Sequence, residues 1–228
     1  TMLNPKVFHQ LSTVQACSSS GKEKEGEVAK VYITKEITPE SLMRIYQALG
    51  REAKVNKVAI KISTGEPGGT NYLKPELIKN LVQSVNGTII ECNTAYGGKR
   101  STTEDHLQAA HDHGFMDIAN VDIMDADGDI GLPVVGGTHI TEDMVGSHYP
   151  AYDFTVVLSH FKGHAMAGFG GAIKNISIGI ASSRGKVRIH SAGTSDTDWG
   201  SPKQEDFLET MAEAAKAITD HCGENILY

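Results

Sequence analysis

Histidine and lysine side chains are concentrated between residues 158 and 190, in a segment where glycines separate many of them. The six residues are His160, Lys162, His164, Lys174, Lys186 and His190. A neutral imidazole can take up a proton near pH 7 or bind a transition metal. A lysine amine that lies beside other cations and apolar residues loses proton affinity and becomes a nucleophile. Clustered titratable groups of this kind predict a functional site rather than a turn with a few surface cations.

Three elements must position this segment. The apolar run Phe154–Leu158 predicts a buried strand, and the apolar run Ile173–Ala181 predicts a packed helix. α/β proteins bind ligands where such a strand ends, and the first turn of the helix offers free N–H groups to an anion. The run Lys186–His190 predicts a further, basic strand. The residues predicted to bind a cofactor here are Gly170, Gly171, Lys174 and Asn175.

Two other glycine-rich loops follow predicted strands, at residues 64–71 and 94–103. Such loops can present backbone N–H groups to a phosphate, and an arginine can form two parallel hydrogen bonds with a phosphate or carboxylate. Ordinary turn chemistry is the alternative for the first loop. The residues predicted to bind an anion or cofactor in these loops are Gly68, Gly69, Thr70, Gly97, Gly98 and Arg100.

The alternation of strands and helices predicts a three-layer α/β fold, with a mainly parallel or mixed sheet and helices on both faces. Predicted strands cover residues 28–33, 57–63, 87–93, 118–124, 131–135, 154–158 and 226–228. Predicted helices cover residues 39–53, 75–85, 103–113, 142–147, 173–181 and 202–221. Asp127-Gly128 predicts a hairpin turn. The helix at 103–113 is expected to turn His106, His111 and His113 toward solvent.

The chain has 228 residues and a net charge of -7, which suits one globular domain and argues against general nucleic-acid binding. Its longest apolar runs are only long enough for strands, so no transmembrane segment is predicted. Residues 28–228 are predicted to form the α/β domain, and we expect that domain to continue beyond Tyr228.

The three cysteines, Cys17, Cys92 and Cys222, lie far apart and form no CxxC pair. A disulfide scaffold or a zinc ribbon is therefore not predicted. An iron–sulfur cluster bound by this chain alone is not predicted either, because a cubane needs four thiolates or close substitutes.

Residues 1–27 are predicted to be a flexible leader or tether. Cys17 begins a small, polar and charged run that resembles the tether of a bacterial lipoprotein, although residues 1–16 contain no apolar signal region. The protein is accordingly expected either in the cytoplasm or anchored by a lipid at Cys17.

From about Val28 to Tyr228 the chain resembles a widespread bacterial domain family of unknown function, whose members are labelled iron–sulfur centre proteins and are often associated with ferredoxins. The matching segments are residues 159–164, 170–175 and 185–193. Members often continue with cysteine-bearing segments after the point where this sequence ends. The resemblance therefore implies, as one alternative, an electron-transfer protein with a redox partner and with 4Fe–4S ligands beyond Tyr228.

The run from His164 to Lys174 is also similar to a signature of the lactate racemase family, His-x-x-Ala-Gly-Phe-Ser-Gly-Gly-x-Lys. In that family the His transfers a proton, the Lys is covalently joined to a nickel pincer nucleotide, and a later His binds the nickel. The resemblance implies these roles for His164, Lys174 and His190, the last of which follows Lys174 by sixteen residues. His160 is a second candidate metal ligand.

The run Gly98–Asp105 resembles a further racemase segment, Thr-His-Arg-Pro-x-Thr-Glu-Glu, with informative departures. Lys99 takes the place of the family's second proton-transfer His, which makes it the catalytic candidate for the opposite wall of the site. Ser101 replaces the Pro, and Gly170 replaces the Ser of the first signature. Racemisation needs a base on each face of the reacting carbon, so these departures leave another reaction or another cofactor open.

These patterns predict a small-molecule enzyme or cofactor-binding domain, with a His/Lys/His site for a phosphate- or carboxylate-bearing ligand. As an enzyme, it would resemble racemases or isomerases, or catalyse another proton transfer that depends on a metal cofactor. A nickel-containing nucleotide and a different metal centre both stay open. The alternatives from other classes are the electron-transfer protein and a surface-tethered binding protein without catalysis.

Overall fold

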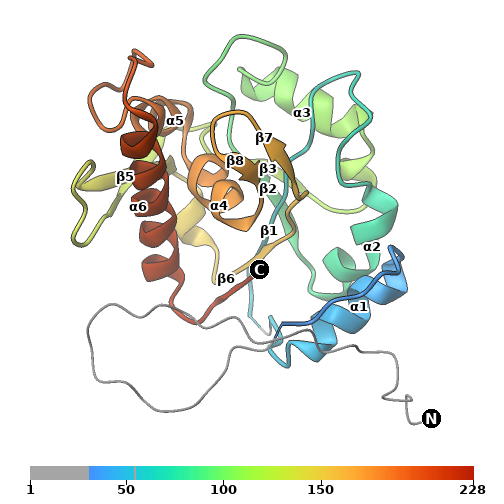
Figure 1. The fold of residues 1–228 in the computed structure, drawn as a ribbon. Coiled ribbons are helices and arrows are strands. Elements are labelled where there is room, and N and C mark those ends of the chain that lie inside the picture. The colour runs from blue at the N-terminus through green and yellow to red at the C-terminus, as the bar shows by residue number, and fades with distance from the viewer. Residues whose placement is uncertain (1–30, 54) are drawn as a thin grey trace, which may run out of the picture. The chain divides into compact units, whose positions relative to one another are not determined.

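The computed structural model describes residues 31–53 and 55–228 and gives the fold in Figure 1. The chain divides into two compact units, residues Thr1–Glu52 and Ala53–Tyr228. The predicted leader at residues 1–27, with Cys17, lies outside the described residues, as does the first half of the strand predicted at 28–33. Residues 31–33 form no strand, so that prediction is wrong for the part that is described.

The described part of the first unit contains the helix α1 (Pro39–Ala48). It begins as predicted, because the Thr38 hydroxyl accepts a hydrogen bond from the Ser41 N–H and the Ser41 hydroxyl accepts one from the Thr38 N–H, both at 3.1 Å. It ends at Ala48 rather than at Ala53, and Gly50 follows with a left-handed backbone (φ +66°) that typically stops a helix.

The second unit is built on a five-stranded sheet in the order β3-β2-β1-β6-β9, in which every neighbouring pair is parallel. Its strands are β1 (Val58–Lys61), β2 (Thr88–Glu91), β3 (Val121–Ile123), β6 (Phe154–Val157) and β9 (Ile226–Leu227). Every residue of β1 and β6 is buried, as a parallel sheet covered on both faces requires. The predicted α/β fold with a mainly parallel sheet is confirmed.

Helices cover both faces of this sheet. They are α2 (Pro75–Ser84), α3 (Thr103–Asp112), α4 (Ala172–Ile180), α5 (Ser183–His190) and α6 (Gln204–Cys222). Short 3-10 helices, η2 (Phe115–Asp117) and η3 (Tyr149–Ala151), precede β3 and β6. The sheet grows from β1 toward β3 in the first half of the unit and toward β9 in the second, so right-handed crossovers place the two groups of helices on opposite faces. Figure 1 shows α2 and α3 on one side, and α4 and α6 on the other.

The segment predicted as a short helix at 142–147 is a strand. β5 (Glu142–Gly146) pairs antiparallel with β4 (Asp129–Pro133), which supplies a hydrogen-bonding partner that overrides local preference. The turn at Asp127-Gly128 exists, but it connects β3 to β4, which belong to different sheets. It is therefore not the predicted hairpin turn.

The basic strand predicted at Lys186–His190 is the helix α5 instead. Its N-terminus is capped by Ser182, whose hydroxyl accepts a hydrogen bond from the Gly185 N–H at 3.0 Å. Val187 and Ile189 fit a strand pattern by their spacing, but both are buried in the helix as well. Glycine at 185 lets α5 lie against β5, because a Cβ there would come within 2.0 Å of the Met144 carbonyl oxygen.

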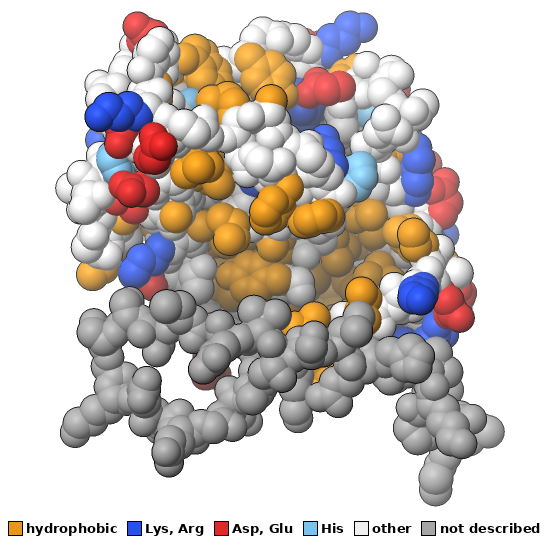
Figure 2. All heavy atoms as spheres, viewed as in Figure 1, with side chains coloured by type: hydrophobic (Ala, Val, Ile, Leu, Met, Phe, Trp, Pro, Cys, Tyr) orange, Lys and Arg blue, Asp and Glu red, His pale blue; other side chains and the backbone are white. Residues whose placement is uncertain are grey.

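The glycine loop expected between β6 and α4 contains a small antiparallel hairpin, β7 (Lys162–His164) and β8 (Gly168–Gly170). The predicted helix at 173–181 is confirmed as α4, which begins after Gly171. Large hydrophobic side chains are exposed on this hairpin and on the first turn of α4, namely Phe161, Met166, Phe169 and Ile173. Figure 2, viewed as Figure 1, shows hydrophobic side chains among basic and His side chains on this face.

Candidate functional site

The strand order creates a switch point at the carboxyl ends of β1 and β6. The chain leaves β1 toward β2 on one side and returns to the other side at β6, which opens a crevice where α/β proteins bind ligands. Asn175 of α4 links the two strand ends, because its amide donates to the Lys61 carbonyl (3.4 Å) and to the Ser159 hydroxyl (3.1 Å). The predicted cofactor-binding residue Asn175 thus lies at this crevice.

Lys162 of β7 and Lys174 of α4 lie together over Gly170. A Cβ at Gly170 would come within 3.7 Å of Lys174 Cδ and 3.9 Å of Lys162 Cγ. Neither ammonium has a hydrogen bond or an ion pair with any residue of the described ranges. Burial lowers the pKa of the Lys174 amine, and the charges of Lys162 and other lysines lower it further. Positive charge therefore accumulates here without an internal partner.

His164 lies at the end of β7 and is held by the turn of the hairpin. Its Nδ1 accepts hydrogen bonds from the backbone N–H groups of Met166 (3.2 Å) and Ala167 (3.1 Å). Burial lowers the pKa of His164, and the charges of Lys174 and Lys162 lower it further. The imidazole is therefore neutral near pH 7.

His190 lies at the end of α5, where its ring packs between two aromatic side chains. The Phe207 ring stacks on it with centroids 5.1 Å apart, and the Trp199 ring meets it edge-on at 4.8 Å. Its Nδ1 lies 2.6 Å from the Lys186 carbonyl oxygen. Burial lowers the pKa of His190, and the charges of Lys174 and His164 lower it further. The hydrogen bond to the Lys186 carbonyl acts in the opposite direction but does not outweigh them.

His164, Lys174 and His190 thus influence one another through their charges, although no hydrogen bond joins any two of them in the described chain. Gly171 lies against two aromatic rings instead, since a Cβ there would come within 3.4 Å of the Phe161 ring and 3.8 Å of the Phe169 ring. His160 is exposed and makes no hydrogen bond among the residues that the structure describes.

Arg100 is buried, and its charge is compensated inside the protein. Its guanidinium pairs with Glu66 and lies 3.7 Å from a carboxylate oxygen of Glu91. Burial acts to lower the pKa of Arg100, but the hydrogen bond to Glu66 and the charge of Glu91 outweigh it and raise the pKa. Arg100 therefore joins the loops that follow β1 and β2, with much of its charge already satisfied. Its neighbour Lys99 is exposed and unpaired within the described residues.

The two glycine loops are on the surface. Their predicted anion-binding residues, Gly68, Gly69, Thr70, Gly97 and Gly98, are all exposed. One of their donors is used locally, because the Gly69 N–H donates to the Glu66 carbonyl at 2.9 Å. That bond is ordinary turn chemistry, and the anion-binding roles of these five residues stay predictions.

Below the crevice lies a buried polar network that the sequence interpretation missed. The Lys61 ammonium, fully buried, lies 2.7 Å from a carboxylate oxygen of Glu91. Glu91 also accepts from the Thr64 N–H at 2.9 Å. Burial acts to raise the pKa of Glu91, but Lys61, His106 and Arg100 hold it at about 2. The one sequence signal was a lysine inside an apolar strand, Val-Ala-Ile-Lys-Ile.

His106 belongs to this network, and its predicted exposure is wrong. Its side chain is fully buried, with Nε2 3.1 Å from the Thr64 hydroxyl and Nδ1 3.4 Å from the Asn93 amide oxygen. Burial lowers its pKa to about 4. His113 is half-buried and stacks on Tyr72 at 4.0 Å, whereas His111 is exposed as predicted.

The described residues contain no cluster of three or more His, Cys, Asp or Glu side chains that could hold a metal ion. Cys92 is buried and donates to the Ile180 carbonyl at 3.2 Å, and burial raises the pKa of its thiol to about 12. Cys222 contacts the Tyr149 hydroxyl at 3.1 Å. No helix in the described part of the chain combines the length and apolar character needed to cross a membrane.

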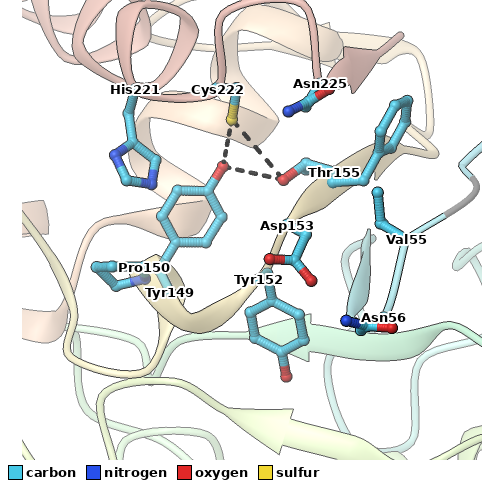
Figure 3. Close-up of a pocket in the computed structure, with 11 residues that line it drawn as sticks. Val55, Asn56, Tyr149, Pro150, Tyr152, Asp153, Thr155, His221, Cys222 and Asn225 are labelled. Atoms are coloured by element: carbon cyan, nitrogen blue, oxygen red, sulfur yellow. Dashed lines mark hydrogen bonds between the residues drawn. The ribbon is translucent and has the colours of Figure 1, made fainter.

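Two cavities lie at the amino ends of the strands, away from the crevice. One has a volume of about 610 Å³ and is lined by residues that precede β1, β6 and β9, among them Asn56, Asp153 and Asn225. Figure 3 shows the hydroxyls of Tyr149 and Thr155 and the thiol of Cys222 pointing toward one another at its edge. The second cavity, about 940 Å³, is lined by residues that precede β1, β2 and β3. Neither cavity is lined by His164, Lys174 or His190.

Residues 58–226 match the family model described as "Domain of unknown function (DUF362)", and the chain belongs to this family. The predicted membership of a domain family of unknown function is thereby confirmed. The match carries no iron–sulfur assignment. A search of curated proteins found no match.

Among solved structures, the chain is similar to the lactate racemase apoprotein from Thermoanaerobacterium thermosaccharolyticum. The TM-score is 0.51 at 17% sequence identity, and the match covers 83% of this chain and 51% of that chain. The chain therefore spans about half the length of that structure. At this level of identity the likeness establishes a shared fold.

Proposed function

We propose that the domain binds a small anionic ligand or cofactor, bearing a phosphate or carboxylate, at the carboxyl ends of β1 and β6. The observation that carries the proposal is the pair Lys162 and Lys174, which converge over Gly170 without an acidic partner in the described chain. The shared fold with the lactate racemase apoprotein supports a cofactor-binding role.

The charge balance favours an oxyanion as the ligand. The chain carries a net charge of -7, yet the charges of Lys162, Lys61 and Lys186 act on Lys174, and the opposing charge of Glu91 is the weaker influence. Since Glu91 already binds Lys61, it cannot neutralise the outer lysines as well. A bound phosphate or carboxylate would supply the missing negative charge through charge-assisted hydrogen bonds.

Calorimetric titration of the full chain with inorganic pyrophosphate at low salt tests this proposal. Lys174→Met should weaken binding by about tenfold or more, the effect of losing one hydrogen bond between charged groups. Lys79→Met is the matched control, because Lys79 is an exposed lysine on α2 and its loss changes the net charge equally. Absence of binding to the wild type, or equal weakening in both variants, would contradict the proposal.

A second candidate function is a covalently attached cofactor of the racemase kind, with Lys174 as the attachment point and His190 as a metal ligand. Two observations favour it. Burial and neighbouring cations lower the pKa of the Lys174 amine, which increases the neutral, nucleophilic fraction. The hydrogen-bond partner of His190 Nδ1 is a carbonyl, which leaves Nε2 for a metal, as in many metal-binding histidines.

The residues present therefore fit a metal-bearing anionic cofactor in part. Lys174 would hold it, His190 would ligate the metal, and His164 and Lys162 would contact its anionic groups. Bound there, the group would supply transition-metal chemistry that side chains lack. The acid/base role of Lys99 and the metal role of His160 are proposed on resemblance and position alone.

Intact-mass measurement distinguishes attachment from simple anion binding. Protein purified from its native host should exceed the sequence mass if a cofactor is attached, and Lys174→Arg should remove the excess while the fold is retained. Arginine keeps the positive charge but cannot act as an amine nucleophile. Activity and mass must come from one sample, and an active wild-type protein of unmodified mass would exclude attachment.

A further inference from the structure

We propose that His164 is fixed in the Nε2–H tautomer and serves as a hydrogen-bond donor to the bound oxyanion, whereas His190 is fixed in the opposite tautomer and presents a lone pair. This inference rests on the proposed function and defines the roles of the two histidines at the same site. It differs from the proton-transfer role that the racemase resemblance implies for His164.

The tautomer of His164 follows from its two backbone partners. The N–H groups of Met166 and Ala167 can only donate, so Nδ1, which they approach at 3.2 and 3.1 Å, must carry a lone pair. A neutral imidazole has one ring proton, which then resides on Nε2. To become an imidazolium, His164 would have to protonate Nδ1 and lose both hydrogen bonds.

The turn of the hairpin makes this arrangement hard to change. His164 pairs with Gly168 across the end of the hairpin, and Gly168 adopts a left-handed backbone (φ +71°) that an L side chain resists. The N–H groups of the turn residues Met166 and Ala167 find their acceptor in the imidazole. Gln204 of α6 donates to the Met166 carbonyl and fixes the turn from the outside.

His190 shows the reverse arrangement. Its Nδ1 lies 2.6 Å from the Lys186 carbonyl oxygen, which can only accept, so Nδ1 carries the proton. Its Nε2 therefore has a lone pair, and the stacked ring of Phe207 restricts rotation of the imidazole. The two histidines of this segment thus offer opposite hydrogen-bonding groups.

The consequence concerns the ligand. With Lys162, Lys174 and the Nε2–H of His164, one wall of the site contains donors only, which suits the oxygens of a phosphate or carboxylate. His190 is the acceptor, and it suits a metal or an acidic proton of the same ligand. The lowered pKa of His164, caused by burial and then by Lys174 and Lys162, agrees with an imidazole that stays neutral.

Long-range ¹H–¹⁵N NMR of the full chain, labelled with ¹⁵N-histidine, tests the tautomers directly. We expect a protonated Nε2 and an unprotonated Nδ1 for His164 at about pH 7.5 to 8, above the ordinary histidine pKa of about 6.5. The reverse should hold for His190. Signals are assigned by their loss in His164→Asn and His190→Gln. A protonated Nδ1 on His164 would overturn the inference, whatever the protein binds.

Two substitutions test the donor role. His164→Asn keeps an acceptor near the position of Nδ1 for the two backbone N–H groups but has no donor that reaches the position of Nε2. It should therefore preserve the melting temperature and weaken pyrophosphate binding about tenfold. His164→Gln extends an amide N–H₂ toward the position of Nε2, so it should retain more affinity while the turn loses stability. His111→Asn, at an exposed histidine of α3, is the control.

The outcomes separate this inference from the proposed function. If wild-type protein fails to bind pyrophosphate, the anion site and the donor role are both wrong, and NMR still decides the tautomer. If wild-type protein binds and His164→Asn binds equally well, the anion site stands and the donor role of His164 is overturned.

Discussion

The two ends of the central sheet differ in where their polar groups find partners. Beside the second cavity, which His148 and Asp122 help to line, His148 is bound by Asp122 and Asp127, with both contacts at 2.8 Å. At the carboxyl ends the inner layer, Lys61 and Glu91 at 2.7 Å, is satisfied in this way, and Arg100 is satisfied by Glu66. The outer layer, Lys162 and Lys174, has no such partner in the part of the chain that the structure describes.

Unsatisfied charge and cavity volume would therefore place a ligand site at opposite ends of the sheet. The cavities of about 610 and 940 Å³ lie at the amino ends, where the neighbouring side chains bond to one another. The carboxyl ends offer charge without a partner. Lys162 is exposed, but the half-buried charge of Lys174 is costly without compensation, so this unsatisfied charge is the stronger indication of a ligand.

The largest effect should follow from breaking the inner layer at the carboxyl ends. Lys61→Met leaves the Glu91 carboxylate buried with fewer partners, and removal of one member of a buried ion pair typically costs about 3–5 kcal/mol of unfolding free energy. Chemical denaturation monitored by circular dichroism measures this cost. The double variant Lys61→Met/Glu91→Gln should recover part of it, because the uncompensated charge is gone.

The exposed pair of Lys216 and Asp220 on α6 is the control for this experiment. Lys216→Met should change stability by less than about 1 kcal/mol, as exposed ion pairs usually do. If the two lysine variants lost similar stability, the inner layer would not be the electrostatic support of the carboxyl ends.

Asp143, a buried acid outside both ends of the central sheet, shows how a missing hydrogen-bond partner affects stability. Asp143 of β5 is 1% exposed, and both of its carboxylate oxygens lack a hydrogen bond in the described structure. Burial raises its pKa to about 8, with Lys186 acting in the opposite direction. Because the folded protein binds this proton more tightly than the unfolded chain, the stability from Asp143 is present below about pH 4 and is lost as the pH rises toward 8.

Asp143→Asn should abolish that part of the pH dependence. The variant should match the wild type near pH 4 and exceed it by several kcal/mol near pH 9, at about 1.4 kcal/mol for each tenfold change in proton affinity. Melting temperatures across this range measure the difference. Asp117→Asn, at an exposed acid of η2, should show no such divergence, and parallel curves for Asp143→Asn and wild type would contradict the assignment.

A smaller effect is expected where α4 approaches β1. A Cβ at Gly179 would come within 2.8 Å of both Cε and Nζ of Lys61, whose ammonium is already held by Glu91. Gly179→Ala should therefore cost about 1–3 kcal/mol through overpacking, and less in the Lys61→Met background. Gly163→Ala, where nothing lies within 4 Å of the new Cβ, should be close to neutral; equal costs in both backgrounds would rule out this contact.

Much of the fold could be predicted from the sequence because its signals are local. Apolar runs, the Thr38 cap and the glycines after the strands indicated most elements of the sheet and its helices. The failures involve non-local partners. β5 is a strand because β4 pairs with it, and α5 is a helix because Ser182 caps it and Gly185 fits against Met144.

The site was less predictable, for the same reason. Residues 160–175 carry a local pattern, so the sequence indicated their segment. The pairing of Arg100 with Glu66 joins residues 34 positions apart, and that of Lys61 with Glu91 joins residues 30 positions apart. The packing of α3 against the sheet buries His106 and exposes His111, five residues later. Only the assembled sheet shows which charges are compensated and which are left for a ligand.

The smallest effect should come from the side of the second cavity, where His148 bridges Asp122 and Asp127. Those two hydrogen bonds raise the pKa of His148, so the fold favours its charged form. The stabilisation is therefore fully present below about pH 6.5, the ordinary histidine value, and is lost as the pH rises through the raised pKa. Because these side chains are partly exposed, the stabilisation should not exceed about 1 kcal/mol and should weaken with salt.

The melting temperature of His148→Gln should accordingly fall below that of the wild type near pH 5.5 and approach it near pH 8.5, whereas His111→Gln should follow the wild type throughout. A difference that persists or grows at high pH would mean that His148 acts through packing, and its contacts with Asp122 and Asp127 would then not depend on charge.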